Sequence, residues 1–173
     1  MPVYTGTLPD QTFELMDRIV NRDKWRAEPM MRKGLRLHTP VLNVLMTYTN
    51  TDPCYTLGEC SKAMMDLQLY HVRYHIRDDI PYNFVLGGDN RIYCGRTWQW
   101  VVPMPEEFRR KHRDTIVIAR IGRPQEDPKQ QEKDFLAGHD LCEWAEELGL
   151  LTKGYNVRMI PNDWNVYENE DPD

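Results

Sequence analysis

Apolar residues along the chain recur mainly in short runs bounded by turn-forming residues, and these runs predict β-strands. They span residues 41–46, 82–86, 91–93, 115–121 and 155–160. The run at 41–46 is apolar enough for a strand buried on both faces, and the run at 115–121 is the clearest strand in the chain. Residues 87–90, Gly-Gly-Asp-Asn, tolerate positive φ, so 82–93 is predicted to be a β-hairpin whose second strand could continue through 98–102.

Other segments carry apolar residues at helical spacing. Residues 10–20 predict a short helix or arm whose inward side chains are Phe13, Leu15, Met16 and Ile19. Residues 59–74 predict a long helix whose apolar face comprises Ala63, Met64, Leu67, Tyr70, His71 and Tyr74. Asp127, in a capping-box arrangement with Gln130, begins a second long helix that runs to Leu148 and is stopped by Gly149. A short helix is predicted at 106–113.

This order of elements predicts a mixed α/β fold. A central mixed β-sheet would have two long helices and one short helix packed around it. We assign residues 1–18 to an N-terminal arm or short helix, 19–166 to one domain, and 167–173 to an acidic, disordered tail.

The charge pattern narrows the class of partner. The formal net charge is −5, and the basic residues are spread along the chain, which argues against nucleic acid. The main basic run, 109–113, is typical of a solvated helix face. No stretch approaches the length of about 18 apolar residues that a membrane-spanning helix needs, and no export signal is visible.

Cysteines and histidines are the candidate metal or redox residues. The cysteines are Cys54, Cys60, Cys94 and Cys142. Spacing does not decide between a disulfide and buried thiols, because pairing needs Cα atoms within about 7 Å. We expect Cys94 and Cys142 to be buried small apolar residues. His71 and His75 share a helix face, but no third ligand stands at a diagnostic spacing, so we expect one core and one surface histidine.

Three motifs follow one another in the centre of the chain. They are Asp-Ile-Pro-Tyr-Asn-Phe at 79–84, Gly-Gly-Asp-Asn at 87–90 and Tyr-Cys-Gly-Arg-Thr-Trp at 93–98. They resemble the Asp-Ile-Gly-Tyr-Asn-Phe, Gly-Gly-Asp-Gly and Tyr-Glu-Gly-Arg-Gly-Trp segments of the peptidoglycan recognition protein family. Upstream, the family pattern Arg-x-x-Trp-x-Ala is matched by Arg22, Trp25 and Ala27. The resemblance covers residues 19–160 and implies the same sheet-and-helix plan.

The resemblance also implies a disulfide between Cys54 and Cys60 that pins the loop after the first core strand to the following helix. A disulfide forms in an oxidising compartment, so we expect an extracellular protein or the ectodomain of a membrane-anchored one. This expectation requires a leader or anchor that has been removed from the sequence. The alternative is a cytoplasmic protein with reduced thiols.

Enzymatic members of the family are zinc amidases that cut between the lactyl group of muramic acid and the first L-alanine of the stem peptide. The resemblance places their three zinc ligands at Thr47, Ile160 and Glu168, none of which is a histidine or cysteine. Catalytic zinc needs about three protein ligands and a bound water. Tyr82 matches the catalytic tyrosine of the family but would have no metal-bound water to assist. We therefore expect no enzyme activity, no metal and no cofactor.

Family members without zinc can still bind muropeptides in the same cleft. The retained candidates for ligand contact are Thr49, Tyr82, Arg96, Trp98 and Trp100. Of these, Arg96 is suited to clamp a carboxylate. One cleft wall, Gly-Ala-His in the family, is here Val-Pro-Met at 102–104, which removes a hydrogen-bond partner and narrows the space. Pro81 and Thr97 replace two family glycines near the same groove.

Three hypotheses follow from these departures. The first is a non-catalytic protein that recognises peptidoglycan fragments in innate immunity. The second is an interaction module that pairs with other recognition proteins or immune signalling proteins, its own groove being closed. The third, a zinc amidase, is remote. An open cleft lined by Thr49, Tyr82 and Arg96 would favour the binder, and exposed Trp100 and Met104 would favour the interaction module.

Overall fold

The computed structural model describes residues 8–32, 34–75, 77–104 and 111–160. The helices are α1 (Thr12–Arg18), α2 (Leu57–Tyr74), α4 (Pro128–Asp134) and α5 (Leu136–Glu147), together with the 3-10 helix η1 (His112–Asp114). The strands are β1 (Ile19–Val20), β2 (Val41–Tyr48), β3 (Phe84–Leu86), β4 (Ile92–Cys94), β5 (Thr115–Arg120) and β6 (Leu151–Met159). Within the described ranges, no helix has the length and apolar character needed to cross a membrane.

The six strands form one mixed sheet in the order β1-β4-β3-β5-β2-β6. β3 and β4 pair antiparallel across the predicted hairpin turn, and the other neighbouring pairs are parallel. The hairpin and the strand at β5 are therefore confirmed. β6 begins earlier than the predicted strand at 155–160.

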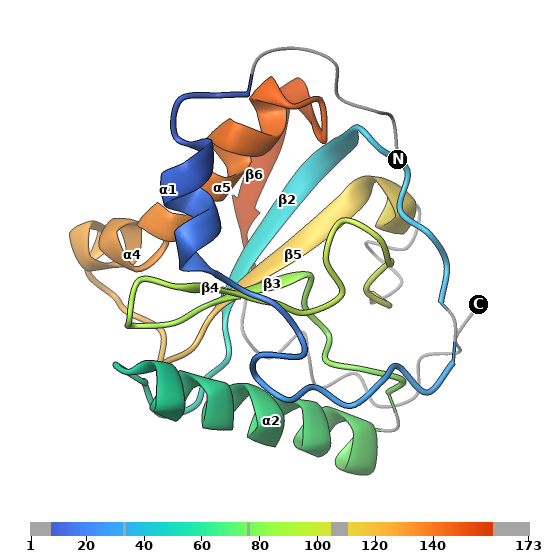
Figure 1. The fold of residues 1–173 in the computed structure, drawn as a ribbon, viewed down its shortest axis with the longest axis vertical. Helices are drawn as coiled ribbons and strands as arrows, with labels where there is room; N and C mark the ends of the chain where they lie inside the picture. The colour runs from blue at the N-terminus through green and yellow to red at the C-terminus, as the bar shows by residue number, and fades with distance from the viewer. Residues whose placement is uncertain (1–7, 33, 76, 105–110, 161–173) are drawn as a thin grey trace.

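Helices cover both faces of this sheet (Figure 1). On β5, Ile116 and Ile118 belong to an apolar cluster that includes residues of α1 and α5. Val117 and Ala119 alternate with them and belong to a second cluster, which includes residues of α2. The strand is thus buried on both sides, and the predicted three-layer architecture is confirmed.

α2 begins where Thr56 caps it. The Thr56 hydroxyl accepts a hydrogen bond from the Glu59 amide, which satisfies one unpaired donor of the first turn. The buried stripe of the helix is Cys60, Met64, Leu67, Gln68 and His71. Tyr70 and Tyr74 are 47% and 66% exposed, so their predicted place on the apolar face is wrong. His75, just after the helix, is buried like His71, and the expected surface histidine is also wrong.

The buried face of α1 is narrower than predicted. Leu15 is buried, but Phe13 and Met16 are exposed, so the prediction is wrong for these two side chains. The helix is attached to α5 by a hydrogen bond from Trp144 Nε1 to the Thr12 hydroxyl at 3.0 Å. Thr12 and Leu15 are the buried residues of this seven-residue helix, so one narrow side of α1 faces the core.

The second long helix is interrupted rather than continuous. Asp127 caps the first turn of α4 as predicted, but the chain leaves helical geometry at Phe135 before α5 begins. At this break the Tyr48 hydroxyl donates to the Asp134 carboxylate at 2.8 Å, and Arg120 donates to the Asp134 carbonyl oxygen at 3.2 Å. These bonds tether the chain to the sheet between α4 and α5. Gly149, at φ +78°, ends α5 as predicted.

The predicted strand continuation at 98–102 is wrong, because the chain turns after β4. Thr97 has a φ of +58°, and Asn83 Nδ2 donates to the carbonyl oxygens of Thr97 and Trp100. The predicted helix at 106–113 falls largely outside the described residues, and its described end forms η1. The predicted tail at 167–173 lies wholly outside them. The division into arm, domain and tail stays a prediction.

Candidate functional site

Two of the three positions at which the resemblance predicts zinc ligands lie next to each other in the structure. β2 and β6 run parallel with Met46 opposite Met159, and the Ile160 amide donates to the Met46 carbonyl oxygen at 2.9 Å. Thr47 and Ile160, which directly follow the paired residues, are therefore neighbours, and both are buried. The third position, Glu168, lies outside the described residues.

The residues at these positions do not fit zinc. A threonine hydroxyl and an isoleucine alkyl chain provide no imidazole, thiolate or carboxylate, the groups that bind zinc in proteins. Ile160 belongs to the apolar cluster on the α2 face of the sheet. In the part of the chain that the structure describes, no group of three His, Cys, Asp or Glu side chains is placed to hold a metal.

Tyr82 lies in the irregular segment between α2 and β3. Its side chain is fully buried in the cluster on the α2 face, and its ring meets His71 edge to face with centroids 6.0 Å apart. Its carbonyl oxygen accepts a hydrogen bond from the Arg96 amide at 2.8 Å. The structure therefore brings Tyr82 and Arg96 together, as neighbours in the same buried layer.

Arg96 is a structural brace in this arrangement. It is 2% exposed, and its guanidinium donates to the carbonyl oxygens of Ile80 at 2.9 Å, Val101 at 3.2 Å and Asp79 at 3.3 Å. Burial lowers the pKa of the guanidinium to about 10, although the neighbouring Asp79 opposes this shift. The donors that would clamp a ligand carboxylate are thus already bonded to the backbone.

The segment 102–104, which the resemblance places in one wall of the family cleft, also packs inward. Val102 and Met104 are 0% and 2% exposed and join the same cluster as Tyr82 and Ile160. Met104 is therefore not exposed, as it would have to be to favour an interaction module. The open cleft lined by Tyr82 and Arg96 that would have favoured a binder is absent too, since both side chains are buried.

The remaining candidates lie elsewhere. Thr49 is half-buried just after β2, where its hydroxyl contacts the Thr51 hydroxyl at 2.7 Å and accepts from the Gly122 amide. Trp98 packs on Phe84, in the cluster on the α1 and α5 face of the sheet, which is the face opposite Tyr82. Trp100 is half-buried, and the Arg36 guanidinium lies over its ring at 4.9 Å. The five candidates therefore do not line one cleft.

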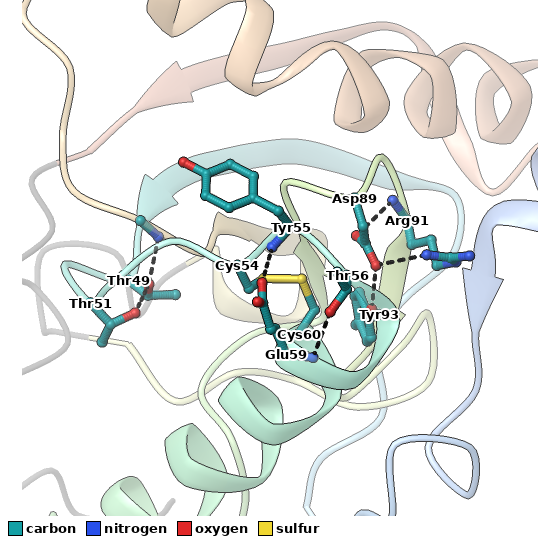
Figure 2. The surroundings of a disulfide bond; sticks show 11 residues. Thr49, Thr51, Cys54, Tyr55, Thr56, Glu59, Cys60, Asp89, Arg91 and Tyr93 are labelled. Atoms are coloured by element: carbon teal, nitrogen blue, oxygen red, sulfur yellow. Dashed lines mark hydrogen bonds and ion pairs between the residues drawn. A yellow bond between two sulfur atoms is a disulfide. The ribbon is translucent and has the colours of Figure 1, made fainter.

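A disulfide between Cys54 and Cys60, implied by the resemblance, is present in the structure (Figure 2). It joins the loop after β2 to the first turns of α2, and it lies against the hairpin turn: a Cβ on Gly87 would be 2.8 Å from the Cys60 sulfur. Tyr93, in β4, donates to the Asp89 carboxylate of that turn at 2.6 Å. Cys94 and Cys142 are buried free thiols, as expected.

Asn83 and Asp79 organise this region and were not singled out from the sequence. The Asn83 amide oxygen accepts from Val117 N in β5, while its amide nitrogen holds the turn at 97–100. The Asp79 carboxylate pairs with Arg22 at 2.9 Å and accepts from Gln68 at 3.0 Å. Asn83 is a polar residue at the start of an otherwise apolar strand, and in the sequence this position indicates a buried, hydrogen-bonded side chain.

Comparisons with known proteins agree on one family. No family model matches the sequence. Peptidoglycan-recognition protein 1 of Holotrichia diomphalia is 33% identical over 145 residues, which are 83% of this chain and 71% of that protein. The N-acetylmuramoyl-L-alanine amidase of Mus musculus is 38% identical over 82 residues, but these span only 46% of this chain and 16% of the amidase. The relatives thus include both a recognition protein and an amidase.

Solved structures show the same fold. Peptidoglycan recognition protein LE in complex with tracheal cytotoxin, a monomeric diaminopimelic acid-type peptidoglycan, matches with a TM-score of 0.73 and 26% identity over 90% of this chain and 86% of that chain. The ectodomain complex of recognition proteins LCa and LCx with tracheal cytotoxin matches with a TM-score of 0.69 and 27% identity over 83% of each chain. Sequence and fold agree, and the chain belongs to the peptidoglycan recognition protein family.

Proposed function

We propose that this chain is a non-catalytic recognition protein that binds bacterial cell-wall fragments in innate immune recognition. One observation supports the non-catalytic part: Thr47 and Ile160, where the resemblance places two zinc ligands, stand side by side, and neither side chain suits the metal. Without the metal-bound water, Tyr82 has no nucleophile to assist. Relatives that bind tracheal cytotoxin support the recognition part.

The accessible candidates for ligand contact are Thr49 and Trp100, which are half-buried. A fragment could reach Tyr82 or Arg96 only after the segment around them moved, because both are enclosed in the α2 face. Trp98, on the opposite face, would serve packing. We propose that Trp100 provides an aromatic contact and Thr49 a hydrogen bond.

We also place the domain outside the cell, as a secreted protein or an ectodomain. The disulfide between Cys54 and Cys60 supports this place, because such bonds persist in oxidising compartments. The related LCa and LCx structure is likewise of ectodomains.

A second function is favoured by the filled wall of the groove. Val102 and Met104 occupy the space on the α2 face with apolar side chains, which suits a protein that no longer admits a polar ligand. Such a protein would act by pairing with another recognition protein, as the LCa and LCx ectodomains assemble with each other.

Calorimetric titration with purified lysine-type and diaminopimelate-type muropeptides tests these functions. Recognition predicts micromolar binding that is the same with and without added zinc. Trp100→Ala should weaken this binding about tenfold, because a buried aromatic contact contributes on this scale. Trp98→Phe is the matched control and should leave affinity unchanged. No heat and no shift in melting temperature at millimolar ligand would exclude recognition and leave pairing as the function.

A further inference from the structure

The end of α2 places two histidines inside the protein. His71 and His75 are 4% and 5% exposed, and the centroids of their rings are 5.3 Å apart. The Tyr70 ring lies edge-on to both, at 5.2 Å from His71 and 4.6 Å from His75, and the Tyr82 ring meets His71 from the other side. Aromatic rings thus enclose the two imidazoles in place of water.

Positive charge faces this pair from two other segments. Arg77, in the turn after α2, is 7% exposed, and Arg96, in the turn after β4, is 2% exposed. Both guanidinium groups oppose a proton on His71, as does His75 itself. A proton on His71 would therefore add a further positive charge to a site that already holds two buried ones.

The carboxylates of the adjoining segment do not offset that charge, because they already have cationic partners. Asp78 pairs with Arg32 at 2.9 Å, and Asp79 pairs with Arg22 at 2.9 Å. His71 Nδ1 has no hydrogen-bond partner among the described residues. The pKa of His71 is lowered to about 3, mainly by burial and further by the neighbouring positive charges.

We propose that His71 makes the packing of the segment 77–82 against α2 sensitive to acid, so that acidification opens this segment and exposes Tyr82 and Arg96. This inference goes beyond the proposed function, and only its consequence for ligand contact rests on that function. The packed arrangement needs a neutral imidazole, whereas the opened one admits a protonated imidazole in contact with water.

The direction of the effect follows from this difference in protonation. An imidazole in water has a pKa near 6.5, so the packed arrangement has its full stability above about pH 6.5 and loses it as pH falls toward the lowered value. Each pH unit in that window favours opening about tenfold. Between pH 7.5 and 5.0 the opening equilibrium should rise about 30-fold for this one group.

The opening is expected to be local. Residues 77–83 form no helix and no strand. Their backbone hydrogen bonds are isolated ones, such as that from the Arg96 amide to the Tyr82 carbonyl oxygen, and the guanidinium of Arg96 adds bonds to the carbonyl oxygens of Asp79 and Ile80. β5, by contrast, lies inside the sheet between β3 and β2. Segments that lack ladder hydrogen bonds open at lower free energy than central strands.

Amide hydrogen exchange followed by mass spectrometry tests this proposal on the whole chain without any ligand. After correction for intrinsic exchange rates, peptides covering 77–84 should lose about 30-fold in protection between pH 7.5 and 5.0, while peptides from β5 should not. His71→Leu should reduce the loss to within about twofold, because the titrating group is gone. His139→Gln, at a half-buried histidine of α5, is the matched control and should behave as the natural chain.

If His71→Leu does not fold, a pH titration of the natural chain, in which nuclear magnetic resonance follows the His71 imidazole, provides a second readout. The proposal predicts that the His71 imidazole stays neutral in the packed state down to pH 5. It is overturned if His71 titrates near pH 6.5 with the packed state intact, or if protection of 77–84 is equal at the two pH values. Neither result depends on whether muropeptides bind, so failure here is distinguishable from failure of the proposed function.

Discussion

Arg96→Lys tests whether the buried guanidinium holds together the segments that flank the hairpin. Arg96 donates to three backbone carbonyl oxygens, on Asp79, Ile80 and Val101. A lysine ammonium is a single point on a flexible stem and cannot reach all three at once. Loss of two charge-assisted hydrogen bonds, each about 1.5 kcal/mol, should lower the free energy of unfolding by about 3 kcal/mol.

Urea denaturation followed by far-ultraviolet circular dichroism at pH 7.5 measures this loss, and an unchanged slope against urea shows that the unfolded state is the same. The matched control is Arg32→Lys, since Arg32 lies on the surface, and no measurable change is expected there. A loss below about 1 kcal/mol for Arg96→Lys, with an unchanged slope, would refute the structural role. It would return Arg96 to the candidates for direct ligand contact.

Four further variants probe the disulfide, the hairpin turn and the turn after β4 by the same urea assay. Replacing Cys54 and Cys60 together by alanine should lower the free energy of unfolding by about 2 kcal/mol, the loop-closure value for a short loop, and equal stability would contradict this. Gly88→Ala should destabilise by about 2 kcal/mol or more, because its Cβ would collide with the Cys54 carbonyl oxygen. Gly58→Ala is its control: it has open space in α2 and should gain about 0.5 kcal/mol, so equal effects at the two glycines would argue against the collision. Thr97→Gly should stabilise by about 0.5 to 1 kcal/mol, since Thr97 has a φ of +58°, and a loss would show that its side chain contributes more than the strain costs.

Local patterns predicted much of the fold. The hairpin follows from two β-rich runs around Gly87 and Gly88. β5 follows from a continuous apolar run, whose successive residues pack on opposite, buried faces of the sheet. The Cys54 to Cys60 disulfide followed from the resemblance, and the structure contains it. These features depend on residues close in sequence, so their signal lies in one window.

Helix faces were less predictable because tertiary contacts select the stripe that is buried. On α2, Tyr74 continues the apolar spacing as well as His75 does, yet only His75 turns inward. On α1, the polar Thr12 is buried because Trp144 supplies a hydrogen-bond donor from a distant helix. The spacing of apolar residues within α1 cannot reveal a hydrogen-bond partner on another helix.

The candidate site shows the same limit more strongly. Tyr82, Arg96 and Trp98 stand close in sequence, but the turn after β4 sends Trp98 to the face opposite the other two. Asn83 causes that turn by holding two carbonyl oxygens with one amide group. The inward packing of Val102 and Met104 likewise depends on tertiary contacts, because the apolar cluster that they join is built from residues of α2 and β5.

The proposed function is recognition of cell-wall fragments without cleavage. The most direct measurement incubates the purified chain with a muropeptide and added zinc, separates the bound ligand, and determines its mass. Non-catalytic recognition predicts that bound muropeptide is recovered intact, because Thr47 and Ile160 cannot hold the metal that would activate a water. Recovery of the free stem peptide would contradict the non-catalytic role, and absence of any bound muropeptide would contradict recognition.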